Sequence, residues 1–200
     1  MKVFLDVNQI KRLLKLADDE RIATGNGRDR ALFHLSVSTG LRISDLLRLR
    51  REDVIDADRA IVRSLHVKMK KTRNWIDRPL RNDCREVLFD YLQSRRDQNP
   101  YLFPAFHKNQ YICQGRPMSR MSAHRTYKKY LRMIFPASMI VGAATHTARR
   151  SMAKIISQKA GRIEPASRFL GHRSTASTAS YVDMDGHEQT ANDIVTEIEL

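Results

Sequence analysis

The sequence predicts a mainly α-helical α+β fold, with a small antiparallel β-sheet inserted at about residues 54–80. Apolar residues recur at helical spacing over most of the chain, whereas 54–80 carries short β-rich runs. No internal repeat or long linker divides the 200 residues, of which 42% are apolar. We therefore expect residues 1–200 to form a single domain with a well-buried core.

Helical periodicity and end signals define six helices. Asp6 or Asn8 caps the first helix, which runs to the polar patch around 18–26, and Gly40 ends the second with the positive φ that glycine adopts easily. The second to sixth helices are expected at about 28–38, 43–49, 81–95, 119–134 and 147–160. A connector containing proline and glycine is expected over 99–117.

The β segment contains three short apolar runs, at 60–62, 65–67 and 75–76. Polar residues separate them, and Pro79 ends the last run because proline cannot donate to a sheet. This pattern predicts a small antiparallel sheet.

The charge balance indicates a polyanionic partner. Thirty-six Lys and Arg against 22 Asp and Glu give a formal net charge of +14, which favours nucleic acid binding. Cys84 and Cys113 form no CxxC pair, so neither a disulfide framework nor a metal site is indicated. The first residues contain no run of signal-peptide length, and no stretch approaches ~20 apolar residues. We expect a cytoplasmic protein without a membrane segment.

Two segments carry arginines suited to phosphate binding. Arg42 is expected at a helix start, where backbone N–H groups favour anions and a guanidinium adds a bidentate clamp. Asp45, three residues on, is placed to orient it. His146 and Arg149 are also three apart, so on a helix they face one ligand, one moving a proton and the other binding charge. Each pattern alone also fits ordinary surface residues.

Two further segments carry candidate functional residues: one contains a histidine followed by a tyrosine, and the other is a run of basic residues. Gly171 permits a close backbone approach beside His172, which can donate to a phosphate or nucleophile oxygen, and Tyr181 follows nine residues later. A phenol needs cationic neighbours to act as a nucleophile. Taken alone, Tyr181 therefore fits a packing residue better, and the Ser/Thr-rich stretch before it fits a flexible loop. The basic run 68–73 could protonate a leaving oxygen from a hairpin.

Taken in order, these segments resemble the tyrosine recombinase (phage integrase) family. They are Gly40-Leu41-Arg42-Ile43-Ser44-Asp45-Leu46-Leu47-Arg48-Leu49, Lys71-Thr72 ahead of Pro79-Leu80, His146-Thr147-Ala148-Arg149, Leu170-Gly171-His172 and Tyr181. The resemblance begins at about Phe4 and covers nearly the whole chain, implying that family's catalytic-domain fold.

The resemblance implies site-specific DNA recombination through a 3′-phosphotyrosyl intermediate, without metal, ATP or another cofactor. Arg42 and Arg149 would clamp the scissile phosphate, with His146 as acid/base or charge partner and His172 as a hydrogen-bonding residue. Lys71 would protonate the 5′ oxygen, and Tyr181 would attack. Residues expected to contact DNA are Lys68, Lys70, Arg73, Arg150 and Arg173.

The resemblance also implies a double-stranded DNA partner and a homotetramer on paired sites, with a monomer in solution. The tail at about 185–200 would dock on a neighbouring protomer or on its own core. The family's N-terminal core-binding domain is expected to be absent.

Two choices stay open from the sequence. Lys70 and Lys68 lie within a register error of Lys71, and on a continuous strand both would face away from it. The alternative functions are a non-catalytic basic DNA-binding regulator and a type IB topoisomerase.

Overall fold

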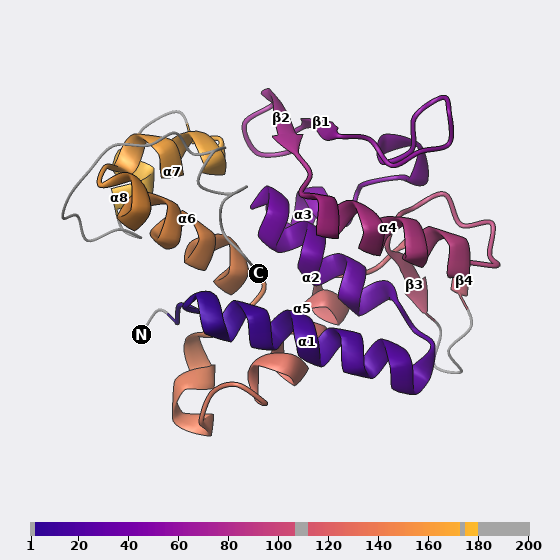
Figure 1. The fold of residues 1–200 in the computed structure, drawn as a ribbon, viewed down its shortest axis with the longest axis horizontal. Coiled ribbons are helices and arrows are strands. Elements are labelled where there is room, and N and C mark those ends of the chain that lie inside the picture. The colour runs from indigo at the N-terminus through magenta and orange to yellow at the C-terminus, as the bar shows by residue number, and fades with distance from the viewer. Residues whose placement is uncertain (1–2, 107–111, 173–174, 180–200) are drawn as a thin grey trace.

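A computed structural model describes residues 3–106, 112–172 and 175–179 of the chain (Figure 1). Helices dominate it, as the sequence predicted. The α-helices in these ranges are α1 (Val7–Thr24), α2 (Arg28–Thr39), α3 (Ile43–Leu46), α4 (Asn82–Ser94), α5 (Arg120–Leu131), α6 (Thr147–Ala160), α7 (Ile163–Leu170) and α8 (Ala176–Ala179). Two 3₁₀ helices, η1 (Arg51–Asp53) and η2 (Ala137–Gly142), lie between them. None of the helices within these ranges combines the length and the apolar character needed to cross a membrane.

The helix ends follow local chemistry. Asp6, rather than Asn8, caps α1: its side chain accepts from the Gln9 amide at 2.8 Å, and the Gln9 side chain accepts in return from the Asp6 amide. α6 has the predicted bounds. α7 was not predicted; its Pro165 lies in the first turn, where a missing N–H breaks no helical hydrogen bond.

The β content consists of two antiparallel hairpins. The strands are β1 (Ser64–Lys68), β2 (Trp75–Pro79), β3 (Pro104–Phe106) and β4 (Ile112–Pro117). β1 pairs with β2 where the sequence predicted a sheet, but the expected run at 60–62 contributes only a bridge between Ile61 and Ile55. The interpretation of 99–117 as connector alone was wrong, because it contains β3 and β4.

Helix α2 forms the centre of the core. Every side chain from Ala31 to Thr39 is buried, and α1, α4 and α6 pack around the helix. Phe33 meets the rings of Tyr127 and Tyr130 edge to face, each with centroids 4.8 Å apart. Because a helix buried on all sides is held by several neighbours, its C-terminal end is fixed in place, and the candidate site begins there.

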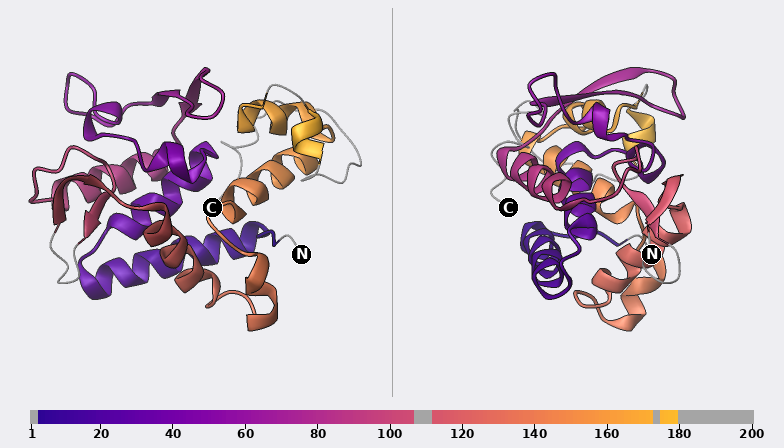
Figure 2. Two further views of the ribbon diagram at one scale, coloured as in Figure 1. Left: turned by 180° about the vertical axis from the view of Figure 1, so that it is seen from behind. Right: turned by 90° about the vertical axis from the view of Figure 1, so that its right-hand side faces the viewer.

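The C-terminal helices form the other wall of the site. Figures 1 and 2 show α6, α7 and α8 gathered on one side of the molecule, beside α3 and the β1–β2 hairpin. Gly40, which ends α2 with φ +58°, lies so close to α7 that an added Cβ would be 2.5 Å from Phe169 Cζ and closer still to Cε1. Only glycine suits this position, on grounds of both backbone and space.

Candidate active site

Arg42 lies at the start of α3, as the sequence predicted. Its backbone is extended (φ −65°, ψ 145°) between the buried Leu41 and Ile43, and its Nη1 donates to Met69 Sδ at 4.0 Å. The expected helix dipole is weak here, because α3 has a single turn.

The expectation that Asp45 orients Arg42 was wrong. The Asp45 carboxylate is buried, and its Oδ1 accepts from the backbone N–H of Lys70 at 2.9 Å. Its Oδ2 has no hydrogen-bond partner among the described residues. Asp45 therefore attaches the turn of the β1–β2 hairpin to α3.

Arg149 connects three parts of the site. Its side chain is buried, and it donates through Nη1 to the carbonyl of Gly40 and through Nη2 to the carbonyl of Leu170 at 2.7 Å. Nη2 also lies 3.3 Å from His172 Nε2. The ends of α2 and α7 are thus joined through the guanidinium, and His172 is held beside it.

The tautomer of His172 follows from its partners. A guanidinium has no acceptor, so His172 Nε2 accepts from Arg149 and the proton sits on Nδ1. Nδ1 lies 2.8 Å from the hydroxyl of Thr178 on α8 and donates to it. Thr178 is fully buried, and the interpretation of this stretch as a loop is wrong for 176–179 because these residues form α8.

The charges around both histidines are cationic. Burial, and then the charges of Arg149, Arg42 and Lys71, lower the pKa of His172 to about 4. Burial, and then Arg150, Arg149 and Arg42, also lower the pKa of His146. Among the described residues, no carboxylate contributes to either shift. The segments therefore converge on a region of positive potential that favours an anion.

The three candidate lysines lie at different places along the β1–β2 hairpin. β1 ends at Lys68, so the argument from alternating strand faces does not apply to Lys70 or Lys71, which lie in the turn. Lys71 is the lysine whose charge acts on His172. Lys68 instead has its ammonium 5.6 Å from the ring centroid of Trp75.

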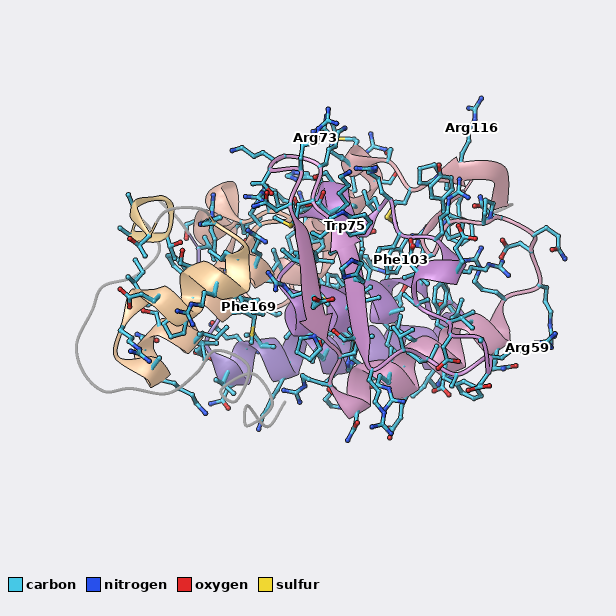
Figure 3. All side chains as sticks on the ribbon, turned by 90° about the horizontal axis from the view of Figure 1, so that it is seen from above. Arg59, Arg73, Trp75, Phe103, Arg116 and Phe169 are labelled. Carbon is cyan, nitrogen blue, oxygen red and sulfur yellow. The ribbon has the colours of Figure 1, made fainter. Side chains whose placement is uncertain are left out.

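The hairpin presents other groups to solvent. Trp75 is 56% exposed and stacks on His66 at 4.6 Å between centroids. Arg73 has φ +60° in the turn, and Figure 3 shows it at the outer end of the hairpin.

The remaining predicted residues divide into two groups. His146 precedes α6 and keeps part of its surface exposed, so the burial that lowers its pKa is incomplete, whereas Arg150 is half-buried one turn further along. Tyr181 and Arg173 lie outside the described residues. Within the described ranges, no group of three or more His, Cys, Asp or Glu side chains could hold a metal ion.

Sequence reasoning missed two residues of this site, Thr178 and Arg78. Thr178 lies within a run of small polar residues, and no local signal distinguishes it from its neighbours. Arg78 lies on β2 and donates to backbone carbonyls of α7. A contact between elements so distant in the sequence leaves no periodic pattern.

A family comparison defines the class of protein. The Phage integrase family matches residues 3–188, so the chain belongs to that family. Among individual relatives, "Probable integrase/recombinase YoeC" of Bacillus subtilis is 27% identical over 180 residues, covering 90% of this chain and 91% of that protein. "Tyrosine recombinase XerD" of Staphylococcus saprophyticus is 27% identical over 183 residues, and the match covers 88% of this chain but 57% of that protein.

Solved structures share the fold. XerH site-specific recombinase bound to difH substrate in a pre-cleavage complex matches with a TM-score of 0.71 and 20% identity, over 92% of this chain and 52% of that one. XerA recombinase matches with a TM-score of 0.67 and 21% identity, over 92% and 60% respectively. The predicted fold class, mainly helical with small antiparallel sheets, is confirmed.

Proposed function

We propose that this chain is a site-specific DNA recombinase that cleaves and rejoins strands through a 3′-phosphotyrosyl intermediate. The observation that carries the proposal is the convergence of Arg42, Lys71, His146, Arg149 and His172 from four separate segments, where burial and then neighbouring cations lower the pKa of both histidines. Such a site suits a phosphodiester anion and the charge that builds in its transition state. The names of the relatives, and the DNA-bound XerH complexes, point to the same reaction.

The two arginines would bind the non-bridging oxygens of the scissile phosphate. Arg149 is already oriented by two carbonyls and His172, so little freedom is lost on binding. A bound phosphate would oppose the surrounding cations and raise the pKa of both histidines. The protonated His172 could then donate to a phosphate oxygen, and His146 would exchange protons as acid or base.

The reaction balances without an added reagent. As the Tyr181 oxygen attacks phosphorus, its proton passes to His146 acting as base; the bond to the 5′ oxygen breaks, and Lys71 gives that oxygen its proton. The products are a 3′-phosphotyrosyl bond and a free 5′ hydroxyl. Attack of a 5′ hydroxyl on the phosphotyrosine reverses the step and releases Tyr181, so the phosphodiester energy is conserved and neither metal nor ATP takes part.

The proposal extends to partners and place. Residues 1–200 act as one catalytic domain on double-stranded DNA, with Lys68, Lys70, Arg73, Arg150 and Arg173 contacting its backbone. Recombination joins two sites, so we expect a homotetramer on paired DNA and a monomer without it. We expect the protein to act in the cytoplasm, on the DNA of a prokaryotic cell that hosts it or the phage or mobile element that carries it.

Adduct formation tests the proposal. Purified protein is incubated in EDTA with a supercoiled plasmid or nicked duplex that carries the sequence flanking its own gene, then denatured. A covalent protein–DNA adduct that is lost in Tyr181→Phe supports the mechanism and the nucleophile. DNA binding without any adduct would favour the non-catalytic regulator, and relaxation of supercoils without strand exchange would favour the topoisomerase.

A further inference from the structure

Arg78 lies between the β1–β2 hairpin and the helix that precedes His172. Its Nη2 donates to the carbonyls of Phe169 at 2.8 Å and Arg168 at 3.2 Å, while Nη1 donates to the carbonyl of Asp77 at 2.8 Å. The guanidinium carbon is 5.9 Å from the centroid of the Phe169 ring, which Figure 3 shows between α7 and the hairpin. A single side chain of β2 thus contacts the last turn of α7.

The same face of the hairpin packs on Gly171. A Cβ added to Gly171 would lie 3.3 Å from Met69 Cε, 3.5 Å from Arg78 Nη2 and 3.7 Å from Ile76 Cγ2. Gly171 ends α7 with φ +62° and is followed directly by His172. The hairpin that carries Lys71 therefore meets the backbone immediately before His172.

Two arginines from different elements satisfy the end of α7. The last carbonyls of a helix have no partner within it. Arg78 supplies donors to residues 168 and 169, and Arg149 supplies one to residue 170. Burial lowers the pKa of Arg78 to about 10, against the attraction of Asp77, so it remains a cation at neutral pH and suits the negative end of the helix.

We infer that Arg78 is a positioning residue that holds Lys71 in register with His172 and Arg149. The inference rests on the proposed function. The turn that bears Lys71 is fastened to α3 through Asp45 and Lys70, and its stem is fastened to α7 through Arg78. Loss of the second attachment leaves the apolar packing of the hairpin but lets its turn move relative to the phosphate. Proton transfer from Lys71 to the 5′ oxygen should slow, because the lysine ammonium must lie within hydrogen-bonding distance of that oxygen.

A change of leaving group separates positioning of Lys71 from general damage. A nicked duplex is prepared with sulfur in place of the 5′ bridging oxygen, at the cleavage position mapped on the unmodified duplex. A thiolate leaves without a proton, because thiols are far more acidic than alcohols. With the oxygen substrate, Arg78→Met should slow adduct formation by about 10- to 100-fold, within the range of general acid catalysis. With the sulfur substrate its rate should return to within a few-fold of wild type, as for Lys71→Ala.

Two controls define the result. Arg85→Met removes another partly buried arginine, which lies on α4 and donates to the backbone carbonyl of Ile61, and should leave both rates unchanged. Arg42→Ala should slow adduct formation equally on the oxygen and sulfur substrates, because it removes charge stabilisation of the transition state. Arg78→Lys, which has one ammonium in place of the forked guanidinium, should show the same preference for the sulfur substrate. This variant replaces Arg78→Met in the test if a thermal melt shows that Arg78→Met is unfolded.

Equal loss on both substrates, or no loss on either, would overturn the role of Arg78 while leaving the proposed function intact. A wild-type protein that forms no adduct on either substrate would instead overturn the proposed function.

Discussion

Replacement of Gly40 by alanine should destabilise the fold through two separate effects. Its φ of +58° costs an L-residue about 1–2 kcal/mol. The added Cβ would also press on the Phe169 ring, 2.5 Å from Cζ, and overpacking of this kind costs roughly 1–3 kcal/mol. Together these predict a loss of about 2–5 kcal/mol, a large part of the roughly 5–15 kcal/mol that holds a typical domain.

Gly25→Ala is the matched control. Gly25 ends α1 with φ +70°, but nothing lies within 4 Å of the position of its Cβ. It therefore carries the backbone cost alone, about 1–2 kcal/mol. Urea unfolding of both variants measures the difference, which should be about 1–3 kcal/mol and is attributed to Phe169.

A double mutant locates the clash. Phe169→Leu should destabilise the wild type by opening space, yet it should cost less in the Gly40→Ala background because it removes the atoms that the new methyl meets. Adduct formation by Gly40→Ala should also fall, since the Gly40 carbonyl accepts from Arg149. Equal destabilisation by Gly40→Ala and Gly25→Ala would refute the argument from close packing.

Three further outcomes are expected. Thr178→Val should slow adduct formation by about 10-fold or more, because His172 loses the partner of its Nδ1, whereas Thr178→Ser should stay near wild type. Lys71→Ala should slow adduct formation by roughly 100-fold or more while Lys70→Ala changes it little, and the reverse ranking would contradict the choice of Lys71. The pKa of His172 is about 4 in the folded protein and near 6.5 in the unfolded chain, so between these pH values the unfolded chain binds more protons. The free energy of unfolding, measured by urea titration, should therefore fall as the pH drops from about 6.5 to 4. The fall should be smaller in His172→Gln.

The ordered motifs and several helix ends were determined by the sequence itself, although the third helix, expected over 43–49, ends at Leu46. A cap such as Asp6 acts on an amide three residues away, and Gly40 ends its helix by its own backbone freedom, so both are visible locally. Helical periodicity likewise located α2 and α6, and with them the approximate positions of Arg42 and Arg149.

Only the tertiary structure decided how these segments meet. The carbonyls that orient Arg149, the hydroxyl that fixes His172 and the capping of α7 by Arg78 all come from other segments, up to 109 residues away in sequence. Lys70 and Lys71 lie in a turn that begins where β1 ends, so strand alternation cannot describe which way their side chains face. Contacts of this kind are set by packing between elements, and packing leaves no period in a single sequence.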